Sequence, residues 1–136
     1  MRSGIKAAFR LLLSAGMIFA GVMHFLTTDD FARIVPAYLP AHRLLVQISG
    51  VFEIAFGAGL LHSATRRWSG WGLVALYVAV FPANINMAVL NMPIHGRHYP
   101  ALLWLRLPLQ FALVAWALWV SKPGKPRPRA DGITTA

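Results

Sequence analysis

Four apolar stretches, each about twenty residues long, constrain most strongly what this chain can fold into. They cover residues 7–26, 44–62, 68–90 and 101–120. A helix rises about 1.5 Å per residue, so each stretch is long enough to cross the hydrocarbon core of a bilayer. In lipid a helix satisfies its own backbone hydrogen bonds, and these stretches lack the alternation of barrel strands. The sequence therefore predicts an all-α, integral membrane four-helix bundle over residues 1–120.

The composition supports lipid as the main partner of the chain. Of its 136 residues, 57% are hydrophobic and only 12% are charged, whereas a small soluble domain needs a largely polar surface. The net charge of +9 could suggest nucleic acid, but the basic residues stand in short clusters between apolar runs and form no stripe. We therefore expect no nucleic-acid partner. The chain has no cysteine, which excludes thiol chemistry and disulfides, and we predict no metal site.

The basic residues are distributed unequally between the two ends of the predicted helices. One side carries Arg2, Lys6, Arg10, Arg66, Arg67, Lys122, Lys125, Arg127 and Arg129, and the other carries Arg33, Arg43 and Arg97. Because positively charged loops stay in the cytoplasm, both termini are expected there. The first stretch is long for a signal peptide and no clear Ala-x-Ala site follows it, so we expect no cleavage. Residues 121–136 alternate proline with basic residues and predict a disordered cytoplasmic tail.

The longest loop, residues 27–43, falls on the outer side. Asp29 and Asp30 follow a threonine pair, which is typical of the first turn of a helix, and Pro36 is expected to end that helix. Its apolar side would carry Phe31, Ile34 and Val35. The loop therefore predicts a short interfacial helix between the first and second spans.

Several polar residues lie inside the predicted spans, where each needs a physical account. Glu53 is at the middle of the second span, Asn84 is in the third, and His24 closes the first. Arg106 lies in the fourth span with Gln110 one turn deeper on the same face. Because the helices alternate in direction, all five fall between mid-membrane and the outer surface. A charge left alone in hydrocarbon costs on the order of 3 kcal/mol, so we predict a buried Glu53–Arg106 ion pair completed by the amides.

Small residues suggest how the helices approach one another at these positions. Gly50 and Gly57 share a helix face with Glu53, and Gly16 and Ala20 share one with His24. Such stripes allow two backbones to come close together.

Each candidate also has a structural interpretation. The ion pair could serve only to fix helix register, and asparagine in a span often joins helices. His24 at a helix end could be interfacial. Trp104, close to Arg106, is the tryptophan best placed to contact a ligand. The predicted ligand-binding set is His24, Glu53, Asn84, Trp104, Arg106 and Gln110.

An ordered series of short motifs runs through residues 8–120. It consists of G-x-x-H-F at Gly21–Phe25, IVPAYLP at Ile34–Pro40, SGVFEIAFG at Ser49–Gly57, ATRRWSGWGL at Ala64–Leu73, FPANINMA at Phe81–Ala88 and LRLPLQ at Leu105–Gln110. The series resembles the DoxX-like family of small four-helix bacterial membrane proteins. The resemblance implies a bacterial inner-membrane protein, and an association with thiosulfate:quinone oxidoreductase or other membrane redox complexes. It carries no established set of catalytic residues.

Three functions follow from these observations. The first is a non-catalytic subunit with an outer-leaflet polar pocket for a quinone or another lipophilic molecule, linked to a membrane redox partner. No cofactor motif is recognisable, so any electron-carrying centre would be a quinone or belong to the partner. The second is a small proton-coupled transporter, although Arg106 would compete with protons for Glu53. The third is an isomerase-like membrane enzyme on an apolar substrate, in which His24 and Glu53 move protons.

Overall fold

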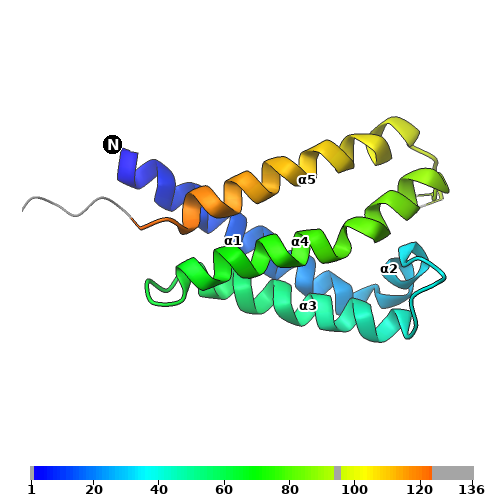
Figure 1. Cartoon of the computed structure of the whole chain (residues 1–136), viewed down its shortest axis with the longest axis horizontal. Coiled ribbons are helices and arrows are strands. Elements are labelled where there is room, and N and C mark those ends of the chain that lie inside the picture. The colour runs from blue at the N-terminus through cyan, green and yellow to red at the C-terminus, as the bar shows by residue number, and fades with distance from the viewer. Residues whose placement is uncertain (1, 94–95, 124–136) are drawn as a thin grey trace, which may run out of the picture.

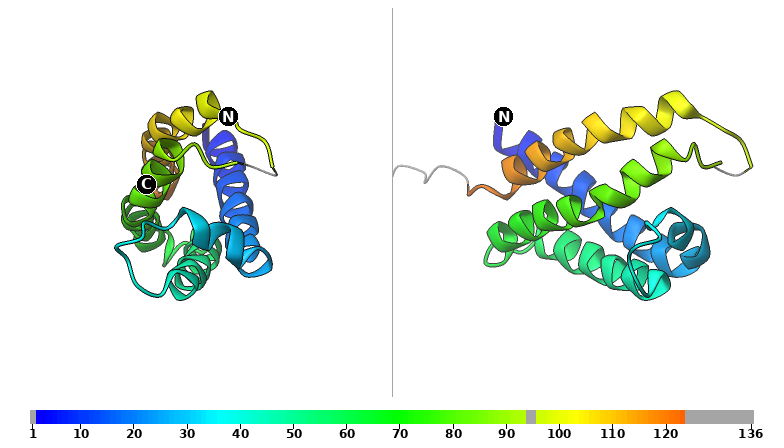
Figure 2. Two further views of the ribbon diagram at one scale, coloured as in Figure 1. Left: turned by 90° about the vertical axis from the view of Figure 1, so that its right-hand side faces the viewer. Right: turned by 45° about the vertical axis from the view of Figure 1, so that its right-hand side comes forward.

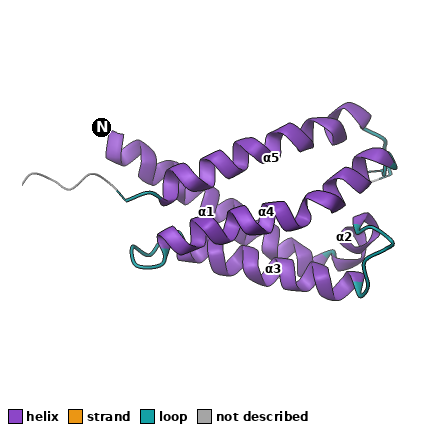
Figure 3. Cartoon of the chain, viewed as in Figure 1, coloured by secondary structure: helices purple, strands orange, loops and turns teal. Residues whose placement is uncertain are grey.

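The computed structural model describes residues 2–93 and 96–123, and within them all regular elements are helices (Figures 1 and 3). The helices are α1 (Arg2–Leu26), α2 (Thr28–Ile34), α3 (His42–Gly59), α4 (Arg66–Val89) and α5 (Pro100–Ser121). The all-α prediction is confirmed. The predicted tail lies outside the described residues from position 124 onward.

Three helices match predicted spans in length and composition. Among the described residues, Gly4–Leu26 of α1, all of α4 and all of α5 are long and apolar enough to cross a membrane. The helix α3 is long enough, with 18 residues, but it is not among these candidates, because His42, Arg43, Gln47 and Glu53 lower its mean hydropathy. Three of the four predicted spans are therefore confirmed as candidates, and the second, which corresponds to α3, is not.

The short helix predicted in the longest loop is present as α2. Asp29 and Asp30 lie in its first turn, where carboxylates favour the positive end of the helix dipole. The helix ends at Ile34, and Val35 is extended with φ −66° and ψ 129°, as expected for a residue before proline. Val35 therefore lies just beyond the helix rather than on its apolar side.

The bundle has two different ends, which we name for their contents. The basic end contains the start of α1, the α3–α4 loop and the end of α5, and the α2 end is the opposite one (Figure 1). A hydrophobic cluster joins α1, α4, α5 and the α3–α4 loop near the basic end. Its most buried members are Leu13, Leu60, Leu73, Ala117 and Val120. Seen end-on, α1 and α3 pack together and α4 packs on α5 (Figure 2).

Two glycines allow α1 and α3 to cross in close contact. A Cβ atom on Gly21 would lie 2.6 Å from the carbonyl oxygen of Gly50, and one on Gly50 would lie 2.9 Å from the carbonyl oxygen of Gly21. No ordinary side chain fits at such distances without backbone movement. Gly16, by contrast, has nothing within 4 Å of its Cβ position. The contact face of α1 therefore contains Gly21 rather than Gly16.

Large apolar side chains cover the outside of the bundle. Phe19, Leu12, Val78 and Phe111 are each exposed by more than half, with Phe19 and Phe111 at 67%. Soluble monomers rarely expose large contiguous apolar patches. Together with the three apolar helices, it identifies a protein that contacts a lipid bilayer.

Candidate functional site

His24 and Glu53 form a buried contact between two ionisable side chains. His24 lies in the last turn of α1 and Glu53 lies in the middle of α3, and the Nδ1 atom of His24 is 2.9 Å from the Oε2 atom of Glu53. His24 is 9% exposed and Glu53 is 8% exposed. Within the described residues, neither of these two atoms makes a hydrogen bond, so their close approach is an ion-pair contact without hydrogen-bond geometry. The pair is therefore an isolated ionic contact between α1 and α3.

Local packing explains why these two side chains meet. The crossing of Gly21 and Gly50 places one turn of α1 directly against one turn of α3, and a Cβ on Gly50 would lie 2.9 Å from the Cβ of His24. His24 follows Gly21 by three residues and Glu53 follows Gly50 by three, so both side chains project near the crossing. The close helix approach therefore positions the pair.

The helix α2 covers the pair. The ring of Phe31 meets the imidazole of His24 edge-on with centroids 4.2 Å apart. The hydroxyl of Thr28 donates to the carbonyl oxygen of His24 at 2.7 Å. Asp29 forms an ion pair with Arg43 at the start of α3. The helix α2 is therefore attached at its beginning by Thr28 and Asp29 and at its middle by Phe31. Contacts from α2 therefore cover one side of His24.

The structure corrects the predicted Glu53–Arg106 ion pair. Arg106 is exposed, and its Nη1 group donates to the sulfur of Met87 on α4 at 3.2 Å. The sequence placed Glu53 and Arg106 at similar depth, but depth does not determine which helices are neighbours. Because α5 packs chiefly on α4 while the carboxylate face of α3 packs on α1, His24 takes the place predicted for Arg106.

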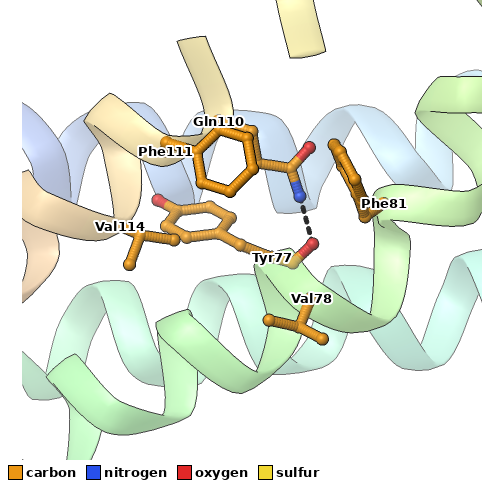
Figure 4. A pocket seen from close by; sticks show the side chains of 6 residues that line it. All are labelled: Tyr77, Val78, Phe81, Gln110, Phe111 and Val114. Atoms are coloured by element: carbon orange, nitrogen blue, oxygen red, sulfur yellow. Dashed lines mark hydrogen bonds between the residues drawn. The ribbon is translucent and has the colours of Figure 1, made fainter. Parts of the chain in front are cut away.

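The amides of Asn84 and Gln110 form a bridge between α4 and α5. The Nδ2 group of Asn84 donates to Oε1 of Gln110 at 2.8 Å, and the Nε2 group of Gln110 donates to the carbonyl oxygen of Tyr77 (Figure 4). Proline at position 82 lies in the same stretch of α4 and removes one helical N–H. The bridge therefore joins the two helices beside this weakened turn, and it supports the interpretation of the amides as helix-joining residues.

Asn86 has a different role that the sequence did not single out. Its Nδ2 group donates to the carbonyl oxygen of Ile34, the last residue of α2, at 3.0 Å. This bond attaches the far end of α2 to α4. Two asparagines two residues apart on a helix point in different directions, which is the signal that Asn84 and Asn86 have separate partners.

A small cavity lies between α4 and α5, apart from the His24–Glu53 pair. It has a volume of about 80 Å³ and is lined by Tyr77, Val78, Phe81, Gln110, Phe111 and Val114 (Figure 4). A dry engineered cavity that binds benzene has about 150 Å³, so this one is too small for a quinone ring. Of the predicted ligand-binding residues only Gln110 lines it, and Trp104 is 54% exposed elsewhere on α5.

These features define a small, all-α, multi-span membrane protein with one buried ionisable pair. The family described as "Domain of unknown function (DUF8561)" matches residues 13–121, and the chain belongs to that family. The matched range includes the His24–Glu53 pair and the Asn84–Gln110 bridge. No curated protein and no solved structure matches the chain.

Proposed function

We propose that this protein is a DoxX-like, four-span protein of the bacterial inner membrane that binds a quinone or another lipophilic molecule at His24 and Glu53. In this proposal both termini are cytoplasmic and α3 is the second span. The protein acts as a non-catalytic subunit of a membrane redox system, and any electron-carrying centre belongs to a partner protein or is the quinone.

The observation that carries the proposal is the isolation of the His24–Glu53 pair. Both residues are more than nine-tenths buried, and the two facing atoms, 2.9 Å apart, make no hydrogen bond among the described residues. Burying an ionic pair gives little net stability unless further hydrogen bonds complete it. Ionisable groups kept inside a membrane domain in spite of that cost usually serve a function.

The chemistry of the pair suits a molecule with carbonyl or hydroxyl groups. A carboxylate at Nδ1 fixes the orientation of an imidazole and leaves its Nε2 atom for a ligand. That atom donates to a quinone carbonyl when the ring is doubly protonated, and accepts from a quinol hydroxyl when the ring is neutral. One histidine can therefore bind the oxidised and the reduced form of the same lipophile.

A ligand at the pair would compete with α2. Phe31 lies on the His24 ring, so a bound ring would replace the phenyl group or pack beside it. Short covering segments of this kind commonly open to admit a ligand. The exposed apolar surface of the bundle would receive the isoprenoid chain.

Native mass spectrometry from nanodiscs that contain ubiquinone tests the proposal. The wild type should retain a quinone mass, and His24→Ala and Glu53→Gln should lose it. Arg106→Ala is the matched control, because Arg106 contacts Met87 rather than Glu53, and it should retain the quinone.

Folding must be followed in the same samples by circular dichroism. Folded His24→Ala and Glu53→Gln proteins that hold as much quinone as the wild type would show that the pair is not the binding site. Loss of quinone in Arg106→Ala alone would move the site to the exposed face of α5.

A proton-coupled transporter is the second candidate, and the identity of the partner of Glu53 favours it. An imidazole exists both neutral and charged in the physiological range, whereas a guanidinium stays charged. With His24 in place of Arg106, Glu53 forms no ion pair with a lysine or arginine among the described residues. Proteoliposomes with an imposed pH gradient should then accumulate a cationic dye, and Glu53→Gln should abolish the uptake. Absence of gradient-driven uptake by the wild type would eliminate this candidate.

A further inference from the structure

Four cationic side chains converge at the basic end of the bundle. Lys6 and Arg10 come from α1, Arg66 begins α4, and Lys122 follows α5. Arg10, Lys122 and Arg66 all lie close enough to Lys6 to repel its ammonium group, and Arg66 repels Arg10. Segments distant in sequence therefore bring like charges together, which is unfavourable unless something compensates them.

Part of the compensation comes from the ends of helices. The Nζ group of Lys6 donates to the carbonyl oxygen of Lys122 at 2.7 Å, and the Nε group of Arg10 donates to that of Val120 at 3.1 Å. The Nε group of Arg66 donates to the carbonyl oxygen of Leu60 at 3.1 Å. Cations at the last turn of a helix satisfy free carbonyls and the negative end of the dipole. These bonds leave N–H groups of all three side chains available.

No carboxylate completes the compensation within the described residues. The acidic residues there are Asp29, Asp30 and Glu53, and their nearest cationic or imidazole partners are Arg43, Arg33 and His24. Asp29 and Asp30 belong to α2 at the opposite end of the bundle (Figure 1). The basic end therefore keeps an excess of positive charge.

Aromatic residues place this cluster at the level of lipid headgroups. Trp68, two residues after Arg66, is 77% exposed, and Trp119 near the end of α5 is 43% exposed. The ring of Phe9 meets that of Trp119 edge-on at 5.6 Å. Tryptophan rings gather where the hydrocarbon core meets the headgroups. The cations thus lie where phospholipid phosphates are, next to apolar side chains that acyl chains would cover.

We propose that Lys6, Arg10 and Arg66 bind the phosphate of an anionic phospholipid headgroup at the basic end. Guanidinium groups bind phosphate oxygens in pairs, and an ammonium group adds a point charge. A lipid is favoured over free phosphate because the cluster adjoins exposed apolar surface, which free phosphate would not use. The site requires only that this end lies at a membrane surface, and is independent of quinone binding.

The test compares full-length protein in phosphatidylcholine nanodiscs with and without phosphatidylglycerol. Two quantities are measured: the phosphatidylglycerol molecules retained in native mass spectrometry, and the rise in unfolding temperature that this lipid causes. Each surface cation contributes on the order of fivefold in affinity for anionic lipid. Arg66→Gln and Lys6→Gln should each weaken retention by about that factor and reduce the lipid-dependent rise in unfolding temperature.

Arg67→Gln is the matched control, since it removes the same charge one residue away. Arg67 is exposed and is not among the cations that act on Lys6 or Arg10. The quantity compared is the rise in unfolding temperature between the two lipid compositions. A lower intrinsic stability of Arg66→Gln affects both compositions equally and does not change this difference. Equal losses in Arg66→Gln and Arg67→Gln would overturn the site in favour of a diffuse surface charge.

Inorganic phosphate distinguishes the two sources of the anion. Added to phosphatidylcholine nanodiscs, it should raise the unfolding temperature of the wild type far less than phosphatidylglycerol does. An equal rise, lost in Arg66→Gln, would assign the site to free phosphate instead of lipid.

Discussion

The Nδ1 atom of His24 lies 2.9 Å from Oε2 of Glu53, and this contact depends on a glycine crossing one turn away in each helix. Gly21 and Gly50 bring the backbones of α1 and α3 so close that a Cβ on either would meet the carbonyl of the other.

Removing one member of the pair should destabilise the protein more than removing both. Glu53→Met or His24→Leu leaves a buried polar group alone, which costs about 1–3 kcal/mol. The double variant replaces the pair with apolar contacts. Its loss in free energy of unfolding should therefore be smaller than that of either single variant. A double-mutant cycle of unfolding in detergent measures this coupling, and strictly additive losses would mean that the two side chains do not interact.

The glycine crossing predicts opposite effects for two similar substitutions. Gly21→Ala should lower the free energy of unfolding by about 1–3 kcal/mol, because the new methyl group overlaps the backbone of α3. Gly16→Ala, on the open side of α1, should be neutral or stabilising by up to about 1 kcal/mol. Thermal unfolding of both variants decides the matter. If Gly21→Ala were as stable as Gly16→Ala, the two helices would not cross at this position.

The bond from Asn86 to the carbonyl of Ile34 should hold α2 closed. Asn86→Ala should speed amide hydrogen exchange in residues 28–34 by roughly tenfold, which corresponds to the loss of about one hydrogen bond. Asn84→Ala serves as control, since Asn84 bonds to Gln110 and not to α2. If quinone enters beneath α2, its association should also be faster in Asn86→Ala. Unchanged exchange in both variants would show that α2 is held by other contacts.

The proposed topology is open to a direct labelling experiment, because the chain has no cysteine of its own. Tyr38→Cys, in the exposed segment after α2, should react with a membrane-impermeant maleimide added to the outside of intact cells. Ser63→Cys, in the exposed α3–α4 loop, should react only after the membrane is opened. Reaction of both residues from the same side would mean that α3 does not cross the membrane.

Much of the fold follows from local sequence, whereas the partners within the site do not. The length and apolar content of each segment predict long helices close to those observed. The acidic first turn after Thr28 and the proline at position 36 likewise predict the short helix. These properties act within one segment. The choice of partner for Glu53 depends on which helices are neighbours and how each is rotated. One face of α1 is buried and shows how this helix is rotated toward α3. It consists of Ser14, Met17, Gly21 and His24. Its hydroxyl at Ser14 bonds to the carbonyl of Gly57 at 2.6 Å.

The same reasoning explains the residues that the sequence missed. Tyr77 and Asn86 have ordinary side chains for a membrane helix, and only tertiary contacts give them roles. Gly16 matched the small-residue pattern as well as Gly21 does, yet it faces open space. Small residues at helical spacing can identify the contact face of a helix. On α1 more than one face carries such residues, so the pattern does not decide between Gly16 and Gly21.

The pairing of α1 with α3 also has a consequence for biosynthesis. The helix α3 has His42 and Arg43 in its first turn and Glu53 at its middle, and it is the long helix that is not a candidate span by itself. Its partner α1 is made earlier, and the His24 side chain is therefore already in the membrane when Glu53 leaves the ribosome. We expect α3 to insert with the help of α1, before α4 and α5 have been synthesised, and a truncated chain that ends after residue 65 to contain the complete His24–Glu53 contact.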